Sequence, residues 1–120
     1  MQATRQIWVV TALLAMAVAI VDTAGLLVYF EKMDGTQLAS IEIAQGKART
    51  AVMFRRPSKV FADQYAGRNR AFTTFPEKPV ASEGGVPIVV DGKIIGAIGA
   101  SGGTGQQDGL AAAAGASAAK

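Results

Sequence analysis

The chain has 120 residues, half of them hydrophobic and only 18% charged, which excludes an intrinsically disordered protein and fits a single domain. It contains no cysteine and no histidine. Disulfides, thiolate or imidazole metal sites and cysteine nucleophiles are therefore excluded, and we expect no metal site. The net charge of +3 is too small an excess to indicate a nucleic-acid-binding protein, so we expect no nucleic-acid partner.

The N-terminal part of the chain contains its most apolar stretch, residues 7–21, with Arg5 before it. A transmembrane helix needs about 20 apolar residues, and Asp22 ends this stretch too soon, so we expect no membrane span. Ala15-Met16-Ala17 resembles a signal-peptide cleavage site, which makes export the alternative to the cytoplasmic location that we expect. The sequence thus divides into a variable apolar segment (1–16), a folded domain (17–115) and a frayed tail (116–120).

The first part of the domain is predicted to hold a hairpin and a helix. β-Branched and aromatic runs at 17–21 and 26–31 flank a glycine-containing turn at 22–25, which is the pattern of a β-hairpin. Thr36 is a candidate N-cap for a helix over residues 37–54. In that helix apolar side chains recur at steps of three and four along one face, at Leu38, Ile41, Ala44, Ala48, Ala51 and Val52.

The middle of the chain is predicted to be less regular. Gly46, inside the predicted helix, indicates close packing against another backbone. Pro57 favours the end of that helix, and Ser58 is a candidate cap for a second short helix that runs to about Tyr65. Residues 66–85 are rich in glycine and proline and indicate a surface loop.

The C-terminal part contains the clearest hairpin. Strands at 86–90 and 93–98 are separated by Asp91-Gly92, the pair that a two-residue type I′ turn favours. Both strands are almost continuously apolar, so helices or another subunit must cover both of their faces. Thr104 and Gln107 form a capping box for a last helix.

The predicted order is therefore β-β-α-α-loop-β-β-α. Two hairpins with helices between and after them indicate an α+β domain, in which helices pack on a small antiparallel sheet. The apolar faces of so small a sheet need a partner to be covered fully, so we expect a homo-oligomer.

The glycine-rich segment 99–105, between the last strand and the last helix, is the most informative local feature. Such a turn presents backbone N–H groups and the positive end of a helix to an anion, but its glycines equally fit a turn that needs their backbone freedom. A basic run offers either a solvated helix face or an anion-binding rim, formed by Lys47, Arg49, Arg55, Arg56 and Lys59. The candidate ligand-binding residues are Lys47, Arg49, Ser101, Gly102, Gly103 and Thr104.

Candidate catalytic groups are few. Without imidazole or thiol, a general base must be a carboxylate or a lysine, and the candidates are Asp34, Glu42 and Lys47. An aspartate at a strand end more commonly forms a turn, and the sequence does not decide whether the protein is an enzyme. The methionines, among them Met16, Met33 and Met53, are expected to fill the core or an interface rather than to ligate haem.

Three motifs follow one another along the chain. The first is VAIVDTAGLLV at 18–28 with KMDGT at 32–36, the second is SIEIAQ at 40–45 with KARTA at 47–51, and the third is GGVPI at 84–88, DG at 91–92 and GAIGASG at 96–102. Together they resemble the GlcG/HbpS-like family, a haem-degrading or haem-binding family that also supplies the C-terminal domain of PduO-type corrinoid adenosyltransferases. The resemblance implies an α+β domain that assembles into dimers or larger rings and binds haem, a corrinoid or another small organic ligand. Since the chain has no histidine, haem would bind here without histidine ligation.

Three functional hypotheses follow. The first is an oligomeric module that binds a small planar or anionic molecule near the turn at 102–104 and the helix that carries Lys47 and Arg49. The second is a cofactor-free enzyme that acts on a small carbonyl or carboxylate compound with a carboxylate or lysine base. The third is a structural or accessory protein of a metabolic pathway.

Overall fold

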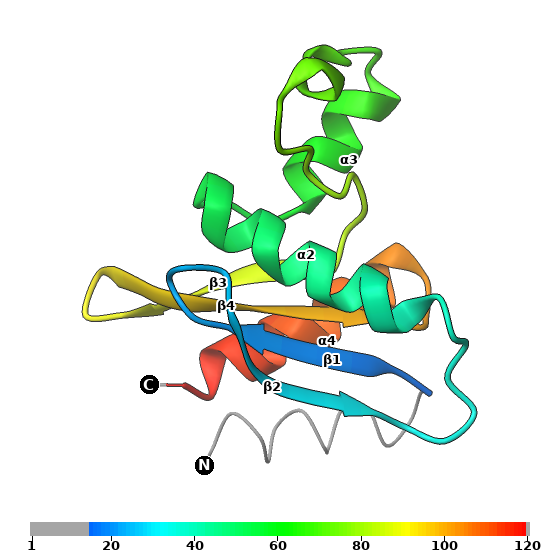
Figure 1. The fold of residues 1–120 in the computed structure, drawn as a ribbon, viewed down its shortest axis with the longest axis vertical. Helices are drawn as coiled ribbons and strands as arrows, with labels where there is room; N and C mark the ends of the chain where they lie inside the picture. The colour runs from blue at the N-terminus through cyan, green and yellow to red at the C-terminus, as the bar shows by residue number, and fades with distance from the viewer. Residues whose placement is uncertain (1–14, 120) are drawn as a thin grey trace.

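The computed structural model describes residues 15–119, so the proposed export signal and most of the segment 1–16 lie outside the described residues. The elements are β1 (Ala17–Val21), β2 (Leu27–Lys32), α2 (Ser40–Phe54), α3 (Lys59–Ala66), the 3-10 turn η1 (Ala71–Thr74), β3 (Gly85–Val90), β4 (Lys93–Ser101) and α4 (Gly105–Ser117). This order confirms the predicted α+β class, with helices on a small antiparallel sheet (Figure 1). Among the described residues, no helix combines the length and the apolar character that crossing a membrane requires.

The sheet has four strands in the order β2-β1-β4-β3, and every neighbouring pair is antiparallel. Each predicted hairpin forms one side of the sheet, and the pairing of β1 with β4 joins the two sides. Ile20 of β1 stands opposite Ile98 of β4 in this central pairing. All five residues of β1 are buried, which explains why this short strand has no polar side chain.

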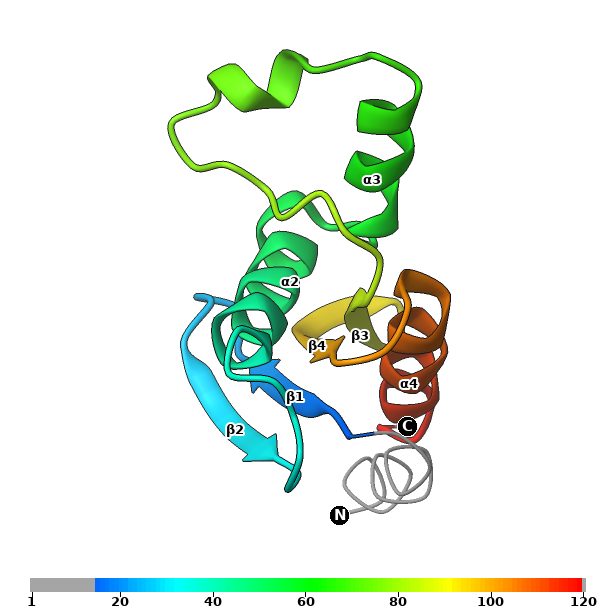
Figure 2. The same ribbon diagram turned by 90° about the vertical axis from the view of Figure 1, so that its right-hand side faces the viewer.

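Two helices cover opposite faces of the sheet, as Figure 2 shows. The residues of β1 belong alternately to the two layers, because successive side chains of a strand point to opposite faces of the sheet. On one face Ala44, Ala48 and Ala51 of α2 pack on Ala17, Ala19, Val21 and Ala97. On the other face Ala111 and Ala112 of α4 pack with Met16, Val18, Ile20, Ile88, Ile98 and Ala100. The prediction that helices cover the apolar strands is confirmed.

The α2 layer is built almost entirely from small residues, so the helix backbone lies close to the sheet. A Cβ atom on Gly99 would collide with the carbonyl oxygen of Ala44 and stand 2.7 Å from the amide nitrogen of Ala48. Gly46 is also needed for packing, but its neighbour is a side chain and not a backbone, because a Cβ there would stand 2.7 Å from Cγ2 of Val80.

The predicted start of the first helix is wrong. α2 begins at Ser40, with Ala39 in the cap position and no side-chain cap. Two successive turns precede the helix, closed by hydrogen bonds from the Thr36 amide to the Met33 carbonyl and from the Ser40 amide to the Gln37 carbonyl. These turns use the residues that the helix was predicted to include, and Thr36 is buried with its hydroxyl unpaired.

Residues 55–81, which we call the arm, extend away from the sheet and hold α3 and η1 (Figure 1). Phe54, Phe61, Phe72 and Phe75 form a chain of ring contacts with centroid separations of 4.9 to 6.1 Å. Ser58 occupies the predicted cap position of α3, but its hydroxyl does not cap the helix. It accepts a hydrogen bond from the Gly85 amide at 2.8 Å and donates to the Ser82 carbonyl at 2.6 Å, which fastens the arm to the start of β3.

The close approach of α2 to the sheet leads to a stability prediction. Gly99→Ala should lower the free energy of unfolding by about 2 kcal/mol or more, because the new methyl group forces α2 away from β4. Gly105→Ala is the matched control, since a Cβ there would stand 3.5 Å from Cβ of Glu83, an ordinary contact. Urea unfolding measures both variants, and equal stability of the two would contradict the close packing.

Candidate functional site

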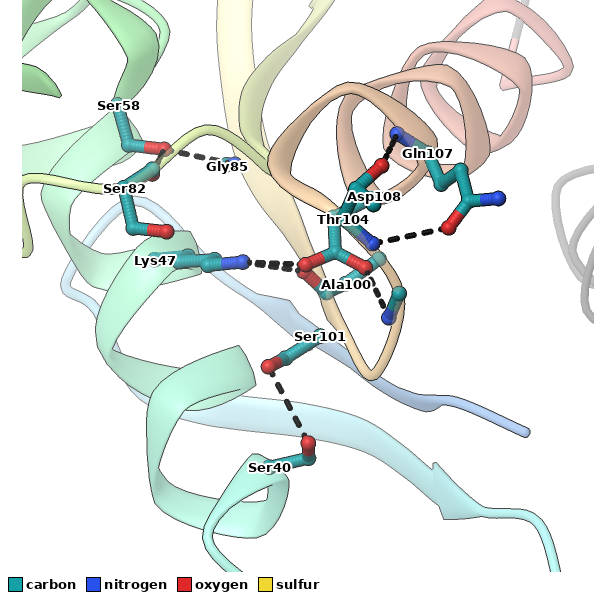
Figure 3. Close-up of polar contacts among 11 residues, drawn as sticks. Ser40, Lys47, Ser58, Ser82, Gly85, Ala100, Ser101, Thr104, Gln107 and Asp108 are labelled. Atoms are coloured by element: carbon teal, nitrogen blue, oxygen red, sulfur yellow. Dashed lines mark hydrogen bonds and ion pairs between the residues drawn. The ribbon is translucent and has the colours of Figure 1, made fainter. Parts of the chain in front are cut away.

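A buried ion pair links the two helices that cover opposite faces of the sheet. Lys47 of α2 and Asp108 of α4 approach to 2.9 Å between Nζ and Oδ2, and their side chains are 1% and 4% exposed. The Lys47 ammonium also donates to the Ala100 carbonyl at 3.0 Å, and the second carboxylate oxygen of Asp108 accepts from the Gly103 amide at 2.8 Å. Each charge is thus held by the other and by the backbone (Figure 3).

Gly84 provides the space for this pair. Its φ of +136° favours glycine, and a Cβ atom there would stand 2.8 Å from Lys47 Nζ and 3.0 Å from Asp108 Cβ. Lys47 was a candidate for both ligand binding and catalysis. Its ammonium is buried and bonded to Asp108 and to the Ala100 carbonyl. Both roles stay predictions, and each would require α2 and α4 to separate so that a ligand could reach the ammonium.

In the glycine turn after β4, the amides of Gly103 and Thr104 donate to side chains of α4. The predicted capping box is confirmed, because the Thr104 amide donates to Gln107 Oε1 at 2.9 Å and the Gln107 amide donates to Thr104 Oγ1 at 3.2 Å. Gly102 has a φ of +148° and lies against the Ala15 carbonyl, so its backbone conformation requires glycine. An anion at this turn would have to displace the bonds that Gly103 and Thr104 already make.

The other predicted site residues lie apart. Ser101 donates to the Ser40 hydroxyl at 3.3 Å in the buried layer below α2. Arg49 is exposed and lies at the β1–β2 turn, where its Cγ would be 3.5 Å from a Cβ on Gly25. Asp34, in the turn after β2, and Glu42, in the first turn of α2, are both exposed. The fold therefore brings Lys47 close to Gly103, and it does not bring Arg49 to that place.

The basic run does not form one rim. Lys47 is buried, whereas Lys59 is exposed and donates to Asp63 at 2.7 Å, a hydrogen bond that raises the pKa of Lys59. Arg56 donates from Nε to the Phe54 carbonyl at 2.9 Å. Within residues 15–119, no cluster of three or more acidic side chains could hold a metal ion.

A cleft lies between the C-terminal end of α2 and the turns of both hairpins. This hairpin-end cleft has a volume of about 570 Å³ and is lined by Thr23, Val52, Met53, Arg55, Gly92, Lys93 and Ile94. It is open and mainly polar, and it offers two cations and a hydroxyl beside three apolar side chains, which suits an anionic group.

Arg55 reaches this cleft because α2 ends there. The Arg55 backbone is left-handed, with a φ of 56°, and its amide donates to the Ala51 carbonyl. This cap turns the chain out of the helix. Sequence reasoning placed Arg55 in the basic run but gave no sign that Lys93, which follows the second hairpin turn, would lie in the same cleft.

Comparisons with known proteins agree with the fold and the motifs. A family model for the haem degrading protein HbpS-like family matches residues 3–117. The chain belongs to the HbpS-like family. Protein GlcG of Escherichia coli K12 is 42% identical to it over 87 residues, which cover 72% of this chain and 64% of GlcG, so the chain spans less than two thirds of that relative.

Solved HbpS-like structures have the same fold. A PduOC complex with haem is 29% identical, has a TM-score of 0.86, and is matched over 98% of this chain and 88% of its own. A double mutant of HbpS from Streptomyces reticuli is 27% identical, has a TM-score of 0.85, and is matched over 99% and 82%. The predicted membership of the GlcG/HbpS-like family is confirmed.

The buried ion pair leads to a second stability prediction. Lys47→Met should lower the free energy of unfolding by about 3–5 kcal/mol, because it leaves the Asp108 carboxylate buried without its partner. The double variant Lys47→Met with Asp108→Leu should lose less than the single variant, since it removes both charges. Urea unfolding measures both.

The matched control is Lys59→Met, which breaks the exposed ion pair with Asp63. It should leave the free energy of unfolding almost unchanged, because water screens exposed charges. A Lys47→Met variant as stable as this control would show that the buried pair does not hold the two helices together.

Proposed function

We propose that this HbpS-like protein binds a small organic ligand in the hairpin-end cleft, and that haem is the first candidate. The observation that carries the proposal is the cleft itself, where Arg55 and Lys93 stand beside the apolar Val52 and Ile94. A solved relative of the same fold is described as a haem complex, and the family model is named for haem degradation.

The lining of the cleft is open and more polar than apolar, and its two cations suit a molecule that carries carboxylates. Arginine and lysine form charge-assisted hydrogen bonds with carboxylates, so Arg55 and Lys93 would hold the propionates of haem while Val52 and Ile94 contact its apolar ring. Bound haem supplies a redox-active iron with strong visible absorption. A corrinoid or a smaller organic acid presents similar apolar and amide or carboxylate groups and is the alternative ligand.

A homo-oligomer, a dimer or a larger ring, is also part of the proposal. β2 is an edge strand, and three exposed apolar side chains stand just before and at its start: Leu26, Leu27 and Val28, with exposed fractions of 66%, 46% and 61%. An apolar edge strand favours pairing with another chain. Native mass spectrometry would give the subunit count and any co-purified ligand together.

The enzyme hypothesis stays a prediction. Asp34 and Glu42 are exposed and do not line the cleft, and Lys47 is closed off by its ion pair. A substrate screen with Asp34→Asn, Glu42→Gln and Lys47→Met separates this hypothesis from binding, because only an enzyme turns over its ligand.

The binding proposal is tested by titrating haemin, cobalamin and small aromatic acids while absorbance and melting temperature are followed. Arg55→Ala combined with Lys93→Ala should weaken binding of the carboxylate ligands by about 10- to 100-fold, because it removes two charge-assisted hydrogen bonds. Lys32→Ala combined with Lys78→Ala is the control matched for net charge, since both lysines are exposed and outside the cleft.

Arg49→Ala distinguishes the cleft from the basic helix face. It should leave the affinity unchanged if the ligand occupies the cleft. If the Arg55 and Lys93 variant keeps the wild-type affinity and the Arg49 variant loses affinity, the ligand binds at the helix face that carries Arg49 and not in the cleft. The absence of any response to all the ligands would refute the proposed function.

A further inference from the structure

Charge is distributed unevenly between the arm and the rest of the domain. The arm, residues 55–81, holds six basic and two acidic residues, which gives it a net charge of +4. The rest of the described chain, residues 15–54 and 82–119, holds four basic and seven acidic residues, which gives it a net charge of −3. The protein is therefore strongly bipolar, although its overall charge is small.

The basic side chains of the arm face solvent. All six are exposed. Within residues 15–119, the arm has one ion pair, between Lys59 and Asp63. The five other cations of the arm form no ion pair in that range, and they are Arg55, Arg56, Arg68, Arg70 and Lys78. A negatively charged partner would relieve the repulsion among them.

The far end of the arm carries side chains of the kind that anchor interfaces. Figure 2 shows the turn between α3 and η1 at the end of the arm farthest from the sheet. There the guanidinium of Arg70 lies 4.0 Å from the ring centroid of the exposed Tyr65. Arg68 stands between them with a φ of 68°, a conformation that glycine adopts at less cost. Tyrosine and arginine are enriched among the residues that dominate binding energies. We call Tyr65, Arg68 and Arg70 the arm tip.

Exposed acidic side chains lie at the opposite end of α2 from the arm. Asp34, in the turn after β2, and Glu42, in the first turn of α2, are both exposed. The arm begins where α2 ends, after Phe54, and a helix of 15 residues is about 22 Å long. Because the arm also extends away from the sheet (Figure 1), its tip does not reach these acids in the same chain.

We infer that the arm tip of one protomer docks head to tail on a second copy of this chain, against the surface that carries Asp34 and Glu42. The contact rests on the homo-oligomer of the proposed function and is separate from the β2 edge. The occupant is a second copy because the opposite charge, in nearly equal amount, lies on the same chain. Complementary potentials steer association and fix the register of an interface. A contact between two different surfaces closes into a ring when the rotation between copies allows it.

Two charge-reversal variants test this contact. Arg68→Glu with Arg70→Glu makes the arm tip negative, and Asp34→Lys with Glu42→Lys makes the opposite surface positive. Each variant alone should associate with itself about 100-fold or more weakly than the wild type, because like charges then face each other across the interface. Arg68→Gln with Arg70→Gln removes only the charge and should weaken association by about tenfold. Sedimentation of the full chain measures the subunit number and the dissociation constant, and association of the wild type should weaken as salt is added.

An equimolar mixture of the two reversal variants should assemble again. The negative arm tip of the first matches the positive surface of the second, and the positive arm tip of the second matches the negative surface of the first. Native mass spectrometry should therefore find both masses in one assembly. The mixture contains the same chains as the separate samples, so it controls for net charge, and its assembly shows that both variants are folded.

The contact and the homo-oligomer fail in different ways. If each reversal variant keeps the wild-type subunit number, the head-to-tail contact is wrong, the homo-oligomer stands and the β2 edge is left to form it. If both variants fold by circular dichroism and their mixture stays dissociated, the contact is also wrong. A wild-type chain that stays monomeric at low salt would overturn the contact and the homo-oligomer together, while ligand binding in the cleft is decided by its own titration.

Discussion

The ion pair between Lys47 and Asp108 is the interaction on which the arrangement of the layers depends. A charged pair that is nearly closed to solvent is stable only when both partners and further hydrogen bonds are in place. Here the Ala100 carbonyl and the Gly103 amide provide those bonds. The pair therefore fixes α2, the end of β4 and the start of α4 relative to one another, and it does so only where Gly84 leaves the space.

The two ends of the sheet differ in how many of their polar groups are already paired within the chain. At the turn that carries Gly103 and Thr104, both of these amides and the Asp108 carboxylate are already paired within the chain. At the hairpin end, cations and apolar side chains line an open cleft. The glycine-rich turn thus contributes to the packing of the domain, and the hairpin end is where we propose that a ligand binds.

Much of the fold could be predicted because its signals are local. The Asp91-Gly92 pair identifies a hairpin, the Thr104 capping box identifies the start of α4, and apolar strands require helices on both faces. The start of α2 could not be predicted, because consecutive turns compete with the helix for the residues after Gly35 and their hydrogen bonds are not visible in a periodic pattern.

The site was harder to predict because its parts are distant in the chain. Lys47 and Asp108 are 61 positions apart, and nothing near either residue signals the other. The aspartate could be noticed only as a polar residue in an alanine-rich helix. The cleft likewise needs the end of α2 to meet two hairpin turns, and this meeting exists only in the assembled sheet.

The two ends of the arm are fastened to the domain, because the Ser58 amide and hydroxyl are both bonded to Gly85 and the Val80 amide donates to the Thr50 hydroxyl. The segment between these two attachments is the part of the arm that lies farthest from the sheet (Figure 1). Lengthening a loop costs little once its ends are fixed, about 0.6 kcal/mol for each doubling of length. The arm is therefore the part of this fold in which residues can be gained or lost during evolution while the helices and the sheet stay as they are.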